Sequence, residues 1–161
     1  AAWQYALLPT SGISFSTSSD AALVFTDARY APQRPYSGRY RFAKHLFRMV
    51  GDLAESGEEH DCAVHIDRLQ QVRAWVRNIP RKDYSFWLQT ASDKFYPDFI
   101  AELRDGRILV VEYKGEHLVS ADDAREKELI GQLWAEQSDG KCLFVVVTNR
   151  DYLAIDRAIA G

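Results

Sequence analysis

The spacing of apolar residues predicts two helices in the first half of the chain. Between 42 and 53 the apolar side chains recur every three or four residues, and they do so again between 56 and 71. Ser56 stands where the N-cap of the second helix is expected, ahead of an apolar face that includes Cys62 and Ile66. We therefore expect two consecutive helices before any sheet.

After Gln71 the pattern changes to alternation, which is typical of β-strands. Asp105-Gly106 separates two of the runs and is a strong hairpin signal. The expected strands are 72–78, 84–90, 98–103, 107–114 and 142–148, and the expected later helices are 120–137 and 151–160. This order predicts an α/β layered fold in which helices flank a central mixed β-sheet.

Serine, proline and glycine residues concentrate between 9 and 41, as they do in connecting segments. We expect 1–41 to be an N-terminal arm or linker from an upstream region, and 42–161 to be the folded domain. The chain begins with Ala rather than Met, which suggests a piece of a longer protein.

The composition limits which binding partners and which cellular compartment are expected. The 161 residues carry a formal net charge of −3, so any binding to nucleic acid requires a local basic patch. Cys62 and Cys142 lie far apart, which argues against a disulfide framework, and no apolar run approaches the roughly 20 residues that span a bilayer. These features favour a cytoplasmic protein with no membrane association.

Charged residues follow directly on the most apolar run of the hairpin. Glu112 and Lys114 come after 108–111, and alternation places both on one face of the strand. The hairpin returns Asp98 to the same end of the sheet. Two carboxylates can bind Mg²⁺ through their oxygens, with the ammonium group beside the ion, and the bound ion can activate water for phosphodiester hydrolysis. The alternative is a plain ion pair, with Asp98 as a turn residue after Pro97.

The length of the hairpin loop decides whether this site can form. A two-residue loop would set Asp98 opposite Tyr113 and point it away from Glu112. A three-residue loop, 105–107, with one residue at positive φ would set Asp98 opposite Lys114, on the face of Glu112. We expect such a loop or a bulge, with the two carboxylates about 5 Å apart or less, as a shared ion requires.

The segments "YPDF" and "VVEYKG" resemble the PD-(D/E)xK nuclease superfamily. Four blocks, "GEEHDCAVHID", "VRAWVRN", "FYPDFIAELRDGRILVVEYKG" and "EKELIGQLWAEQSDGKCLFVVV", are together similar to the nuclease domain at the C-terminal end of type III restriction subunits and related helicase-linked proteins. The likeness extends from residue 38 to residue 150. It implies a restriction-endonuclease-like fold.

The resemblance also implies a Mg²⁺-dependent DNA endonuclease, with Mn²⁺ able to substitute, as part of a restriction or repair helicase. Asp98 and Glu112 would bind the metal, Lys114 would be the catalytic lysine, and the helical Glu59 would complete the metal shell. The implied partners are DNA, an upstream helicase or ATPase region of the same chain, and a second copy for double-strand cleavage. The alternative is a non-catalytic DNA-binding or protein-docking module that retains the nuclease fold.

Some assignments stay open in the sequence. Glu59 could form a capping box with Ser56 at the start of its helix instead of serving a metal. Lys127 could point toward a DNA phosphate, or it could pair with Asp123 one helical turn away. Basic residues around the strands could likewise contact phosphates or form only a solvent face; they are Arg73, Arg77, Arg81, Lys82 and Lys94.

Overall fold

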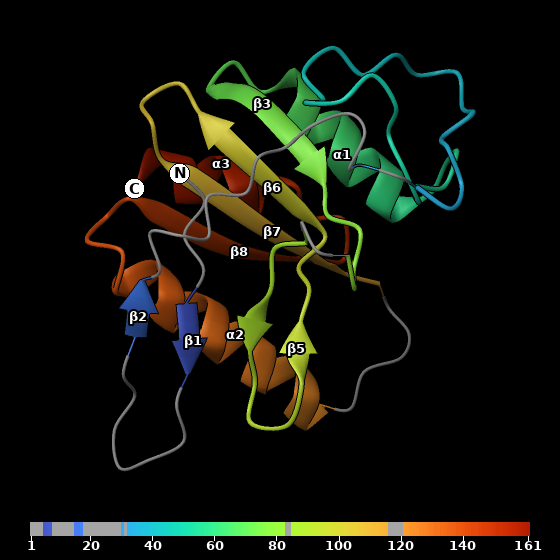
Figure 1. Ribbon diagram of the computed structural model, residues 1–161. Coiled ribbons are helices and arrows are strands. Elements are labelled where there is room, and N and C mark those ends of the chain that lie inside the picture. The colour runs from blue at the N-terminus through green and yellow to red at the C-terminus, as the bar shows by residue number, and fades with distance from the viewer. Residues whose placement is uncertain (1–4, 8–14, 18–29, 31, 83–84, 116–120) are drawn as a thin grey trace.

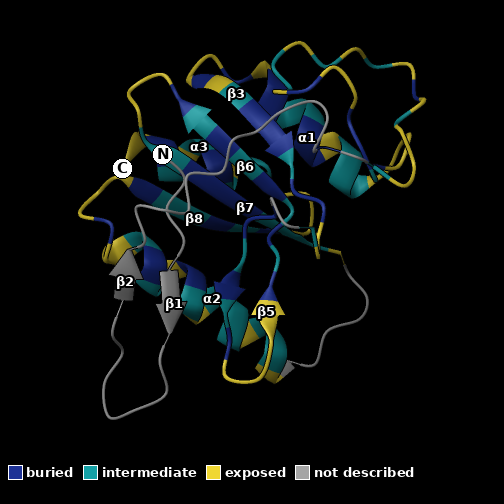
Figure 2. Cartoon of the chain, viewed as in Figure 1, coloured by how far each residue is buried: buried dark blue, intermediate teal, exposed yellow. Residues whose placement is uncertain are grey.

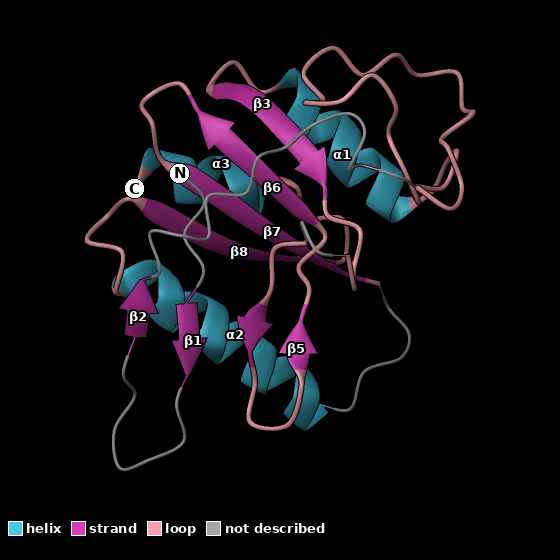
Figure 3. Cartoon of the chain, viewed as in Figure 1, coloured by secondary structure: helices cyan, strands magenta, loops and turns pink. Residues whose placement is uncertain are grey.

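A four-stranded mixed sheet forms the centre of the structure, a computed structural model that describes residues 5–7, 15–17, 30, 32–82, 85–115 and 121–161. Its strands, in spatial order, are β3 (Val72–Arg77), β6 (Phe99–Leu103), β7 (Ile108–Lys114) and β8 (Cys142–Thr148) (Figure 1, Figure 3). β6 is antiparallel to both β3 and β7, whereas β7 and β8 are parallel. The expected mixed sheet is confirmed.

Helices cover both faces of this sheet, as the element order predicts. They are α1 (Glu58–Arg68), α2 (Ala121–Glu136) and α3 (Leu153–Ala160). Successive residues of β7 point to opposite faces, so Val111 packs in one core with α1 and α3 while Val110 packs in the other with Trp134 of α2. Within the described residues, no helix has both the length and the apolar composition of a membrane-spanning segment.

Two small ladders lie outside the central sheet. They pair β1 (Tyr5–Leu7) with β2 (Phe15–Thr17), and β4 (Leu88–Gln89) with β5 (Lys94–Phe95). Of the strand expected over 84–90, the described residues form only β4, which lies outside the central sheet. The Asn78 side chain accepts from Phe86 N–H at 3.0 Å and donates to Phe86 O at 2.8 Å. It thereby uses the backbone groups that a neighbouring strand would need.

Residues 42–53 form no helix, contrary to their apolar spacing, because they run beside the edge of β3. Leu46 N–H donates to Trp75 O at 2.8 Å, and Trp75 N–H donates to Lys44 O at 3.0 Å. The buried carboxylate of Asp67 in α1 accepts from Lys44 N–H at 2.9 Å. The backbone groups of this segment are therefore bonded to β3, α1 and residues 34–36 rather than to one another.

The described part of 1–41 packs on the domain. Tyr30 is buried and stacks on Phe47 with ring centroids 4.4 Å apart, and Pro35 forms an antiparallel bridge with Gly51. In Figure 2 most residues of the loop 32–51, which lies beside α1, are of intermediate or full solvent exposure, whereas the central strands are largely buried. This loop is therefore anchored to the domain by its backbone while many of its side chains face solvent.

Candidate active site

The hairpin between β6 and β7 closes with a three-residue loop, 104–106. Leu103 N–H donates to Arg107 O at 2.8 Å on either side of the loop, and Gly106 has a φ of 89°. The expected loop length and positive-φ residue are confirmed. The loop lies one residue earlier than the expected 105–107, and this difference changes the register.

The register places Asp98 opposite Glu112 at the end of the sheet. The ladder pairs Phe99 with Val111, and the next step along both strands joins Asp98 to Glu112, rather than to Lys114 as expected. Opposed residues of antiparallel strands share a face, with Cβ atoms about 4.5–5.5 Å apart. The observed register therefore brings the two acids closer than the expected one.

The carboxyl group of Glu112 is buried beside that of Asp98. Burial raises the pKa of Glu112 to about 9, the negative charge of Asp98 and a hydrogen bond between the two side chains raise it as well, and Lys127 and Lys114 partly oppose the rise. The two acids therefore influence one another's ionisation, and the buried Oε2 of Glu112 has no hydrogen-bond partner among the described residues.

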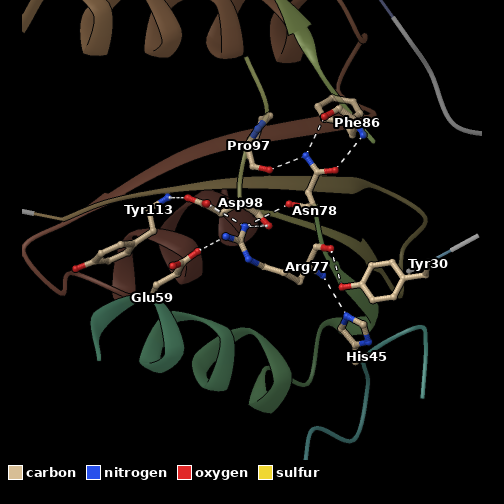
Figure 4. A network of polar contacts seen from close by, with 9 residues as sticks. All are labelled: Tyr30, His45, Glu59, Arg77, Asn78, Phe86, Pro97, Asp98 and Tyr113. Atoms are coloured by element: carbon tan, nitrogen blue, oxygen red, sulfur yellow. Dashed lines mark hydrogen bonds and ion pairs between the residues drawn. The ribbon is translucent and has the colours of Figure 1, made fainter. Parts of the chain in front are cut away.

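Asp98 is fixed by groups from two neighbouring strands (Figure 4). Tyr113 N–H donates to its Oδ2 at 2.8 Å, and Arg77 Nη1 donates to its Oδ1 at 3.0 Å and to its backbone oxygen at 2.8 Å. Asn78 N–H also donates to the Asp98 backbone oxygen at 2.8 Å. The plain turn role that the sequence left open for Asp98 does not account for these bonds.

Glu59 does not cap its helix. α1 begins at Glu58 with Gly57 as N-cap and no side-chain cap hydrogen bond, so the expected Ser56 cap is wrong and Glu59 is one residue too early for a capping box. Its carboxylate pairs instead with Arg77 Nη2 at 2.5 Å. Burial raises the pKa of Glu59 to about 7, Arg77 opposes this, and contact with Asp98 adds to it. Glu59 therefore belongs to the same acid cluster.

Lys114 ends β7 on the face of Glu112, next to the cluster rather than within it. Its Nζ donates to Ala124 O in α2 at 2.9 Å. Lys127 approaches from α2 and pairs with Asp123 at 2.7 Å, which is one of the two roles that the sequence left open. Both amines lower the pKa of Glu112, which shows that their charges act on its carboxyl.

Arg77 is the main residue of this site that the sequence pattern misplaces on a solvent face. Its side chain is 11% exposed and it bridges Glu59 and Asp98. The cause is a register irregularity between Val72 and Ala74, which interrupts the alternation and leaves Arg77 on the core face with Trp75. Alternation counted forward from buried Trp75 would have identified it.

Comparison with profiles of protein families, with curated proteins and with solved structures finds no match. In the part of the chain that the structure describes, no group of three or more His, Cys, Asp or Glu side chains is placed so that it could hold a metal ion. The site has two opposed acids, Asp98 and Glu112, and Arg77 forms ion pairs with both Asp98 and Glu59.

Proposed function

We propose that this chain is a divalent-metal-dependent DNA endonuclease domain that hydrolyses phosphodiester bonds, as the resemblance implies. The register that sets Asp98 opposite Glu112 at the end of a mixed sheet, with buried Oε2 of Glu112 lacking a partner among the described residues, carries the proposal. An upstream motor region of the same protein, and a second copy to cut the second strand, belong to the same proposal.

The acid pair fits a hard cation. Oε2 of Glu112 is buried and has no hydrogen-bond partner among the described residues. Two neighbouring carboxylates repel one another unless a proton or a cation lies between them. Mg²⁺ and Mn²⁺ prefer oxygen ligands, so Asp98 and Glu112 would hold the ion and Glu59 would complete its shell. When bound, the ion would lower the pKa of a water molecule and offset phosphate charge.

Lys114 supplies the cationic side chain of the proposed reaction. It shares the face of Glu112, and its bond to the Ala124 carbonyl keeps the amine beside the acid pair. From there it can orient the attacking water or stabilise negative charge on the phosphate as the bond to the leaving oxygen breaks. The amine cannot serve as a metal ligand while it is protonated.

The loop beside α1 supplies a basic surface for the DNA backbone. Residues 32–51 contain no Asp or Glu, although the whole chain is acidic. Four arginines of this loop are exposed, and within the described residues none of them makes an ion pair; they are Arg34, Arg39, Arg41 and Arg48. Unpaired arginines on a fixed backbone suit contacts to phosphate oxygens that carry no sequence information.

Replacing Arg39 and Arg41 by glutamine should weaken binding to a short fluorescent DNA duplex in EDTA. The slope of log affinity against log salt should become shallower by about 0.9 for each phosphate that the protein no longer neutralises. Arg104→Gln with Lys141→Gln removes the same charge at the end of the sheet away from Asp98 and Glu112 and should leave the slope almost unchanged. Equal slopes for both double variants would exclude this loop as the contact surface.

The test of the proposed function is nicking of supercoiled plasmid with Mg²⁺ or Mn²⁺. The unmodified domain should convert the plasmid to the open circle. EDTA should prevent conversion because it removes the ion, and Glu112→Ala should prevent it because the ion then lacks a ligand. Glu102→Ala removes another acid of the same sheet and should retain nicking. DNA binding with no nicking by the unmodified domain would instead favour the non-catalytic module.

A further inference from the structure

Arg77 brings a permanent positive charge into the acid cluster. Its guanidinium reaches across from β3 to the start of α1, with Nη2 2.5 Å from Glu59 and Nη1 3.0 Å from Asp98 Oδ1 (Figure 4). The group is 5.3 Å from the ring of Phe99, and its buried Nε has no acceptor among the described residues. Arg77 is therefore held by the two carboxylates and by its bond to the Asp98 backbone oxygen, while its Nε is left without an acceptor.

The position of this guanidinium overlaps the part of the cluster that a cation needs. A divalent ion on Asp98 and Glu59 would use oxygens that are now paired with Arg77: Asp98 Oδ1 accepts a hydrogen bond from it, and Glu59 Oε1 forms an ion pair with it. Arginine cannot release its charge by losing a proton, and a second cation a few ångströms away would be strongly repelled in a buried site. Arginine and metal therefore cannot both occupy these oxygens.

We propose that Arg77 is the resident cation of the acid cluster and that a divalent ion binds by displacing its guanidinium from Glu59 and Asp98 Oδ1. This inference rests on the metal site of the proposed function. In the metal-free protein Arg77 keeps the two acids together; in the metal-bound protein the ion takes over that role. Arg77 is thus a positioning residue, and its removal favours metal binding even though it weakens the metal-free site.

The experiment is calorimetric titration of the domain with Mn²⁺ alone. Arg77→Met removes the competing charge and should bind Mn²⁺ about tenfold more tightly than the unmodified protein, with a larger thermal stabilisation by the ion. Arg73→Met, on the same strand but in an exposed pair with Glu102, should bind like the unmodified protein. Equal or weaker binding by folded Arg77→Met would overturn the inference.

A second measurement needs no substitution. Titration of the unmodified domain with Mg²⁺ should shift the Arg77 Nε–H signal in a nitrogen-15 NMR spectrum, while the Arg73 signal stays in place. Metal binding without a shift of Arg77 would overturn the inference and leave the proposed function intact. Tighter metal binding by Arg77→Met in a domain that never nicks plasmid would support the inference and contradict the nuclease. Absence of Mn²⁺ binding in both proteins would overturn both.

Discussion

Replacing Lys114 by methionine should lower the rate of plasmid nicking by about a hundredfold or more, while the affinity for Mn²⁺ stays equal or rises slightly. Lys114 lies on the face of Glu112, and its charge lowers the pKa of that carboxyl without forming an ion pair with it. Methionine keeps most of the side-chain volume but loses the charge. The chemical step therefore loses its cationic group, and the metal loses only a repelling neighbour.

The two readouts separate a catalytic lysine from a structural one. Nicking is measured on supercoiled plasmid and metal affinity by calorimetry, with thermal unfolding to show that the variant is folded. Lys94→Met serves as the control, since this exposed lysine belongs to the small β4–β5 ladder. Normal nicking by folded Lys114→Met would assign the lysine to its bond with the Ala124 carbonyl alone.

Replacing Glu112 by glutamine should stabilise the metal-free domain at about pH 8 and remove the stabilisation that Mn²⁺ gives to the unmodified protein. The pKa of Glu112 lies near 4.5 in the unfolded chain and at about 9 in the folded one, chiefly because of burial. Between these values the folded state holds a proton that the unfolded state has released. Stability of the unmodified domain therefore falls as pH rises through this window.

Glutamine carries no charge in either state, so the variant escapes this loss. Its unfolding midpoint should exceed that of the unmodified domain by several degrees at about pH 8, since about 1 kcal/mol shifts a domain of this size by about 2–4 °C. The difference should shrink toward pH 4, where the carboxyl is protonated in both states. Glu102→Gln is the control, because Glu102 forms an exposed ion pair. A pH-independent difference would show that Glu112 is not buried against Asp98.

Secondary structure followed largely from local pattern. Each main element buries one or both of its faces, and a buried face requires apolar residues to recur with the period of a helix or of a strand. This holds for α1, β3, β6, β7, α2, β8 and α3. The segment 42–53 has a helical period and no helix, because its backbone groups bond to β3 and Asp67. Apolar spacing indicates which side chains are buried, but not which groups from distant segments form hydrogen bonds with the backbone.

The two acids of the candidate site were determined by the sequence itself. Asp98 begins one strand, Glu112 ends the next, and a short loop joins them, so any hairpin brings them to one end of the sheet. The one-residue choice of register was decided by the loop 104–106, which ends where Arg107 O accepts from Leu103 N–H. That choice depends on bonds across the ladder that the residue pattern does not specify.

Only the tertiary structure placed Arg77 in the cluster and decided between the two roles that the sequence left open for Glu59. Glu59 could have capped its own helix, and a strand arginine could have faced solvent. The irregularity in β3 turns Arg77 toward the core, and Gly57 rather than Ser56 starts α1, so the two side chains meet at Asp98. Their roles arise from contacts between segments far apart in the chain, because a buried charge is stable only where another segment supplies its partner.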